Sequence, residues 1–90
     1  MKRTIILRTI RATIVCLGPL TFGVGPEGQD VRCLTVDRVA DDGSTKLERL
    51  GLFLVGQDAH CATLKLGQVM RITYEVSVKQ GRVVRTIVKS

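Results

Sequence analysis

The stretch that decides the fold runs from residue 70 to residue 88 and reads MRITYEVSVKQGRVVRTIV. In its first ten residues apolar side chains alternate with polar ones, and the apolar positions are Met70, Ile72, Tyr74, Val76 and Val78. This period of two predicts an antiparallel strand with one buried and one wet face, and it favours a core position for Tyr74. Residues 79–82, KQGR, predict a tight hairpin, and residues 83–88 complete a second strand beside the first.

Three further strands are expected upstream of this hairpin. Residues 31–39 form one run rich in Val, Leu and Thr, and roughly residues 46–55 form another, with a turn at residues 40–45. The first run, residues 5–16, has apolar residues at Ile5 and Leu7 and then at even positions from Ile10 onward. This switch predicts a bulge near Arg8–Thr9, in a long bent strand of the kind found in small barrels.

Two segments lack the strand pattern. Residues 18–28 contain four glycines and both prolines, so we expect a loop of about ten residues there. Residues 58–66 predict a helix of about two turns, capped by Asp58, with Ala59, Ala62 and Leu66 on one side. Gly67 is placed to end that helix.

This order of elements predicts the fold class. Three strands, a short helix and a two-stranded hairpin indicate an all-β, five-stranded Greek-key barrel of the oligonucleotide-binding (OB) type. Its short helix lies between the third and fourth strands. We expect residues 1–90 to form a single domain, since a chain of this length supplies one core. An SH3-like barrel, which usually lacks the helix, is the alternative.

Composition narrows the classes of function. Fourteen Lys and Arg against eight Asp and Glu give a net charge of +6, which favours an anionic partner such as nucleic acid or a membrane surface. The longest uncharged run, residues 12–26, is too short and too rich in Gly and Pro to span a bilayer. Arg8 and Arg11 interrupt the apolar start, so a secretory signal is not expected and a cytoplasmic location is.

No pattern of catalytic or metal-binding residues stands out. Cys16, Cys33 and Cys61 lack metal-ligand spacing, and we expect them to be small buried hydrophobic residues. His60 is the single histidine, which favours a structural role over a metal or catalytic one. No phosphate-binding glycine motif is present. The chain is therefore expected to be neither an enzyme nor a protein with a cofactor or metal.

Several segments resemble bacterial single-stranded-DNA-binding proteins (SSB). Residues 28–36, GQDVRCLTV, are similar to that family's second strand, and residues 55–59, VGQDA, followed by 64–69, LKLGQV, are similar to its helix region. Pro19 falls where the family has a proline after its first strand. The family's stacking Trp and Phe on the third strand correspond to Arg49 and Val55 here, and its acidic C-terminal tail is absent. The resemblance implies an OB domain built for single strands.

Single-strand binding requires cations along the phosphates and flat groups for the bases. Phe53 is the candidate stacking platform, and Arg49 on the same side of its strand is able to stack or to hold a phosphate. The candidate nucleic-acid-binding cations are Arg11, Lys46, Arg49, Arg71, Lys79 and Arg82. For each of them a solvated surface position is the alternative, and for Phe53 it is packing against a neighbouring subunit.

The sequence thus supports two hypotheses. The first is a homo-oligomeric protein that binds single-stranded DNA in replication or recombination, with RNA also open as a ligand. Its small size suits a phage-encoded, plasmid-encoded or accessory factor. The second is an OB-type adaptor or assembly subunit for a protein partner, favoured by scarce aromatics and by the apolar loop residues Leu20, Phe22 and Val24.

Overall fold

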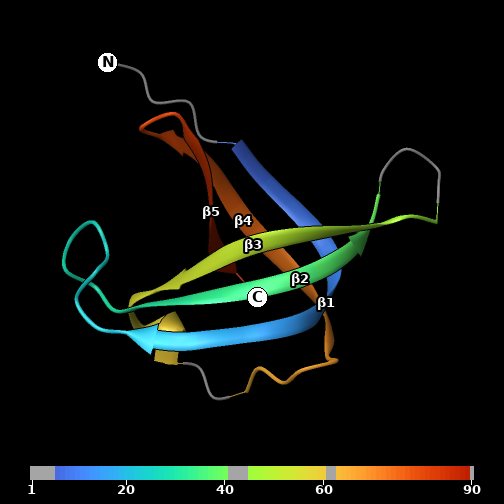
Figure 1. The fold of residues 1–90 in the computed structure, drawn as a ribbon, viewed down its shortest axis with the longest axis horizontal. Helices are drawn as coiled ribbons and strands as arrows, with labels where there is room; N and C mark the ends of the chain where they lie inside the picture. The colour runs from blue at the N-terminus through green and yellow to red at the C-terminus, as the bar shows by residue number, and fades with distance from the viewer. Residues whose placement is uncertain (1–5, 41–44, 61–62, 90) are drawn as a thin grey trace.

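The computed structural model describes residues 6–40, 45–60 and 63–89, except for the side chains of Lys79 and Lys89. Its elements are β1 (Ile6–Thr21), β2 (Val31–Val39), β3 (Leu47–Val55), the 3-10 helix η1 (Gly56–His60), β4 (Val69–Lys79) and β5 (Arg82–Lys89) (Figure 1). The strands close into a barrel in the order β1-β2-β3-β5-β4. All pairs are antiparallel except β3 with β5, which confirms the predicted OB-type architecture.

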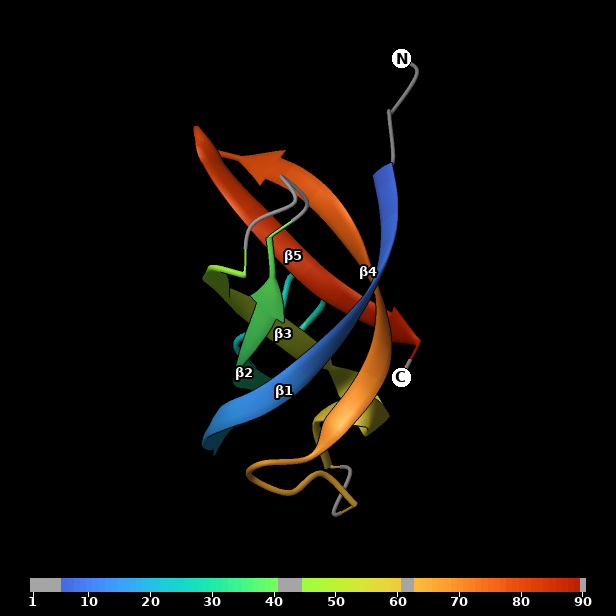
Figure 2. The same ribbon diagram turned by 90° about the vertical axis from the view of Figure 1, so that its right-hand side faces the viewer.

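The long first strand serves both sides of the barrel. Its first half, from Ile6 to Thr13, pairs with β4, and its second half pairs with β2 (Figure 2). The predicted bulge near Arg8–Thr9 is wrong, because the register with β4 is unbroken over that half. The register shifts fall later, after Ile14 and after Leu17. Of the two apolar residues from which the bulge was inferred, Leu7 is exposed at the end of the barrel and imposes no change of buried face, and Ile5 lies outside the described residues.

The predicted loop over residues 18–28 begins too early, because β1 continues to Thr21. Gly18 and Pro19 lie within the second register shift of β1, where a proline costs no ladder hydrogen bond. A Cβ at Gly18 would come 3.0 Å from the carbonyl oxygen of Cys33, so this close approach of β1 to β2 favours glycine. The connection between β1 and β2 is therefore residues 22–30.

The predicted two-turn helix is also corrected. Only η1 is helical among the described residues there, it is of the 3-10 type, and Leu66 is exposed rather than packed. Ala62 lies outside the described residues. Gly67 donates to the carbonyl of Ile14 at 2.8 Å, and Ile14 donates to the carbonyl of Gln68 at 2.9 Å. Because the chain already pairs with β1 at these residues, it has little length left for a second turn.

The core lies inside the barrel and is formed by the inward-facing residues of all five strands. It comprises Ile10, Ala12, Ile14, Leu34, Val36, Leu50, Leu52, Leu54, Ile72, Tyr74 and Ile87, with Ala59 and Leu64 closing one end. The predicted core position of Tyr74 is confirmed. The predicted hairpin is also confirmed, since Gln80 and Gly81 both have positive φ, as its tight turn requires. Among the described residues, no helix has the length and apolar character needed to cross a membrane.

Two of the three cysteine predictions are wrong. Cys16 and Cys33 are exposed free thiols. Each lies next to an inward-facing residue on its strand, so the alternation of the sheet turns its side chain outward. Cys61 lies outside the residues that the structure describes.

Candidate nucleic-acid interface

Phe53 lies on the floor of a groove on the outer face of the barrel. It faces outward, opposite the buried Leu52 and Leu54, and 37% of its surface remains exposed. The groove has a volume of about 470 Å³. Its lining residues are Val24, Gly25, Pro26 and Gln29 from the loop 22–30, Val31, Phe53 and Val55 from β2 and β3, and Glu75, Ser77, Val84 and Thr86 from the β4–β5 hairpin. We call it the Phe53 groove.

The loop that walls this groove is held at its base by Asp30. One carboxylate oxygen of Asp30 accepts the Gly23 N–H at 3.1 Å, and the other lies 2.7 Å from His60 Nε2 on η1. The hydrogen bond to His60, followed by that from Gly23, holds the pKa of Asp30 below its ordinary value. The Asp30 carbonyl also accepts the Gly56 N–H at 2.9 Å. These contacts fix the loop against η1 and give His60 a structural role.

Arg49, Gly51 and Phe53 are alternate residues of β3, so Arg49 lies on the same outer side of the strand as Phe53. Its guanidinium donates to both oxygens of Asp37 on β2, at 2.9 Å and 3.2 Å. The hydrogen bond from Arg49 lowers the pKa of Asp37. Arg49 is therefore an exposed cation whose charge is balanced by a neighbouring carboxylate.

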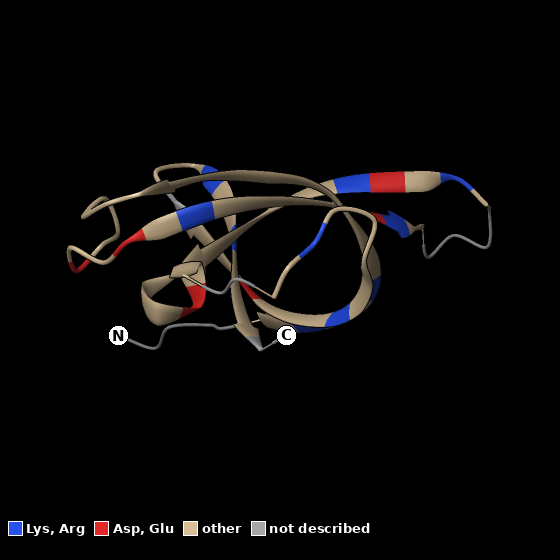
Figure 3. Cartoon of the chain, turned by 90° about the horizontal axis from the view of Figure 1, so that it is seen from below, with Lys and Arg blue, Asp and Glu red and all other residues tan. Residues whose placement is uncertain are grey.

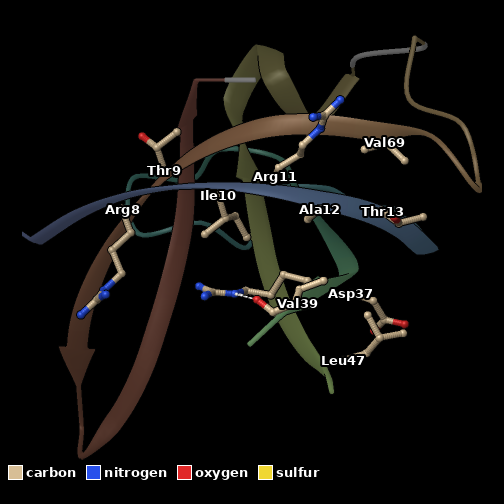
Figure 4. A pocket seen from close by; sticks show the side chains of 11 residues that line it. Arg8, Thr9, Ile10, Arg11, Ala12, Thr13, Asp37, Val39, Leu47 and Val69 are labelled. Atoms are coloured by element: carbon tan, nitrogen blue, oxygen red, sulfur yellow. Dashed lines mark hydrogen bonds between the residues drawn. The ribbon is translucent and has the colours of Figure 1, made fainter. Parts of the chain in front are cut away.

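Arg11 and Arg71 are register partners on the outer face of β1 and β4. Beside them the hydroxyls of Thr9 and Thr73 are 2.9 Å apart. Arg11 also lines a hollow of about 670 Å³, formed where β1 separates from the β2–β3 hairpin (Figure 4). Its charged lining residues are Arg8, Arg11, Asp37 and Arg38, and we call it the arginine cleft.

The remaining predicted cations lie near the two hairpins. Lys46 immediately precedes β3, and its carbonyl accepts the Ala40 N–H at 3.0 Å. Arg82 begins β5 and is the register partner of Lys79, the last residue of β4. The side chain of Lys79 lies outside the described part of the chain.

The structure thus distributes the predicted site over more than one face. The basic residues lie on several strands around the barrel (Figure 3). Phe53 and Arg49 share the outer side of β3, but the described residues that line the Phe53 groove include Glu75 and no Lys or Arg. Arg11 and Arg71 belong instead to the face formed by β1 and β4.

Sequence reasoning did not identify Arg8, Arg38 or Pro26 as site residues, and it named Val24 only as an apolar loop residue. Arg8 was assigned to a bulge that does not exist, and Arg38 was given no role beyond its place in the strand of residues 31–39. The spacing along the strands identifies Arg8 and Arg38. Arg8 lies two residues from the inward-facing Ile10, and Arg38 lies two residues from the inward-facing Val36. The described residues contain no group of three or more side chains able to hold a metal ion.

The closed strand order, with η1 between β3 and β4, defines an oligonucleotide-binding barrel. Among solved structures, the chain is similar to the protein priB from Ralstonia solanacearum, with a TM-score of 0.73 and 14% identity over 92% of both chains. It is also similar to the SSB domain of a Synechococcus protein, with a TM-score of 0.64 and 12% identity over 92% of this chain and 90% of that one.

These similarities show an SSB-like OB fold, as the sequence resemblance predicted. No protein-family model matches the sequence, and a search of curated proteins finds no match.

Proposed function

We propose that this protein binds single-stranded DNA and protects or organises it during replication or recombination. The observation that carries the proposal is the position of Phe53 in an SSB-like barrel: a partly exposed aromatic ring on the outer side of β3. OB folds bind oligonucleotides on this face, between the first loop and the last hairpin.

Two kinds of interaction support the proposal. A base stacked on the exposed ring of Phe53 contributes about 1–3 kcal/mol. The net charge of +6 attracts the phosphates over a longer range. Arg49, on the same outer side of β3 as Phe53, and Arg82, in the β4–β5 hairpin that walls the groove, are the cations that we expect to contact phosphates beside the stacked base.

One aromatic platform gives modest binding per barrel. For this reason we propose that the protein acts as a homo-oligomer or binds cooperatively along the strand, so that several platforms act on one DNA molecule.

The test is a titration followed by fluorescence anisotropy. A labelled single strand of roughly 16 nucleotides is long enough for one barrel. We expect binding at low salt, with an affinity that falls linearly against the logarithm of the salt concentration. Duplex DNA and single-stranded RNA of the same sequence serve as competitors. Absence of binding at low salt, or an affinity independent of salt, would reject the proposal.

A second candidate function is that of a protein-interaction adaptor. It is favoured by the apolar tip of the loop 22–30, where Phe22 is 70% exposed and Val24 is also exposed. In that case Phe22→Ala disrupts assembly with a partner, while Phe53→Ala leaves nucleic-acid affinity unchanged. The reverse pattern supports DNA binding instead.

A further inference from the structure

The two ends of the barrel differ in chemistry. At one end the core is closed by Ala59 of η1 and by Leu64, both buried. At the other end the inward-facing residues become charged. Side chains two residues apart on a strand point to the same side. Arg8 lies two residues before the buried Ile10 on β1, and Arg38 lies two residues after the buried Val36 on β2.

The same pattern holds for two more strands. Glu48 precedes Leu50 on β3, and Arg85 precedes Ile87 on β5. Four of the five strands therefore place a charged residue at one mouth of the barrel, and three of the four residues are arginines. We call these four residues, Arg8, Arg38, Glu48 and Arg85, the arginine mouth.

The arginine mouth surrounds a hollow of about 320 Å³ whose floor is formed by Leu50, Tyr74 and Val76. Arg38 and Arg85 are half-buried, while Arg8 and Glu48 are exposed. An apolar floor and partial burial strengthen the field of the guanidinium groups relative to fully solvated ones.

The residues that line the mouth carry more positive than negative charge. Three guanidinium groups face one carboxylate, which leaves a net charge of +2. In the part of the chain that the structure describes, neither Arg8 nor Arg85 forms an ion pair. Planar guanidinium groups match the oxygens of a phosphate with paired hydrogen bonds, so an anionic oxygen ligand suits this mouth.

The mouth also continues into the arginine cleft. Arg8 and Arg38 line both hollows, and in Figure 4 Arg8 and Arg11 point to opposite sides of β1. Arg11 in turn neighbours Arg71 on β4. The arginines thus form a track from the barrel end around β1, which fits a ligand with repeated single charges better than one small anion.

We propose that this track, from Arg85 through Arg8 and Arg11, binds the phosphodiester backbone of a single-stranded polynucleotide. It is a second contact surface, lined by residues that the Phe53 groove does not contain. The proposal rests on the proposed function for the identity of the polymer. It adds that affinity and salt dependence depend on residues at the barrel end, away from the stacking platform.

The test compares Arg85→Gln with Lys65→Gln. Lys65 is exposed in the turn after η1, near the opposite end of the barrel, so both variants lose one positive charge. If Arg85 contacts one phosphate, its loss reduces the salt slope by about 0.7 and weakens binding about eightfold at roughly 50 mM salt. We expect Lys65→Gln to retain the wild-type slope. Arg85→Lys, which keeps the charge, should retain most of the slope and shows whether loss of packing is responsible.

An abasic oligonucleotide separates phosphate binding from stacking. We expect Arg85→Gln to weaken binding of this strand and Phe53→Leu to leave it unchanged. If the wild-type protein binds no single strand, the proposed function fails. If it binds but Arg85→Gln keeps the wild-type affinity and slope, only the present inference fails. Polyglutamate is the competitor that tests for an acidic protein ligand. If it displaces the abasic strand as readily as an unlabelled polynucleotide does, the ligand is an acidic protein and the present inference is overturned.

Discussion

Replacing Asp37 by Asn is expected to strengthen DNA binding. Asp37 neutralises Arg49 through two hydrogen bonds, at 2.9 Å and 3.2 Å. It is also the single carboxylate among the described residues that line the arginine cleft. The amide is close in size and shape to the carboxylate but carries no charge. The substitution therefore removes a negative charge between Arg49 and the cleft.

The size of the effect follows from the local charges. The cleft contains three arginines and one aspartate, so its net charge rises from +2 to +3 while Arg49 loses its counterion. If the released Arg49 contacts one additional phosphate, the salt slope steepens by about 0.7 and binding tightens about eightfold at roughly 50 mM salt. Because the ion pair is at the surface, we expect little loss of fold stability.

Anisotropy titrations at several salt concentrations measure both quantities. The control is Asp58→Asn, which makes the same change of charge on the exposed surface of η1. We expect the control to have the wild-type slope. The reasoning is refuted if folded Asp37→Asn binds no more tightly than wild type. It is also refuted if Asp58→Asn tightens binding equally, since net charge rather than the local carboxylate would then be responsible.

Three further predictions concern stacking, the core and acid. Phe53→Leu removes the flat ring and should weaken single-strand binding by at least about 1 kcal/mol, or roughly fivefold. The control variant Phe22→Leu should bind as tightly as wild type. Equal affinities for all three proteins would contradict stacking on Phe53. Leu52→Ala should lower the free energy of unfolding in urea by about 2–5 kcal/mol, because Leu52 is fully buried. A loss well under 1 kcal/mol would contradict a packed barrel interior. The carboxylates of Asp30 and Asp37 have lowered pKa values, so the stability they add is complete above the ordinary value of 3.8 and is lost as the pH falls below it. The urea midpoint should fall less on acidification when both residues are Asn, and an equal fall would disprove this.

Local sequence patterns were sufficient for much of the fold. The alternation of residues 70–78 fixed which side chains of β4 face the core, and Tyr74 lies there. Val78 shares that alternation but is 69% exposed, because the barrel no longer surrounds the strand at its end. The alternation predicts on which side of a strand a residue lies, but not where the barrel ends.

The errors have the same physical origin. Gly18 and Pro19 are usually turn residues, but here they lie in a strand, because β2 passes close to β1 at an irregularity of the ladder. Neither the neighbouring strand nor the register shift is visible in the local sequence. The bulge near Arg8 was inferred from the parity of Leu7, which is exposed and has no core to face.

For each strand, the sequence predicts on which side a candidate site residue lies. It does not predict which residues of different strands share one surface of the barrel. Alternation along β3 placed Phe53 and Arg49 on the outer side. Closure of the barrel then separates Phe53 from Arg11 and Arg71, which belong to the face formed by β1 and β4. The meeting of Arg8 and Arg85 also depends on closure, because they are far apart in the sequence and lie on strands that do not pair with each other.

The two register shifts of β1 also determine where this strand can change its length during evolution. One residue inserted between Arg11 and Ile14 would invert the strand from there to the N-terminus, turning Arg11 inward and Ile10 into water. At residue 15 or at residues 18–19 the ladder is already interrupted, so one residue can be gained or lost without that inversion. Distant homologues should therefore differ in length at these two places and preserve the spacing between Arg8 and Ile14.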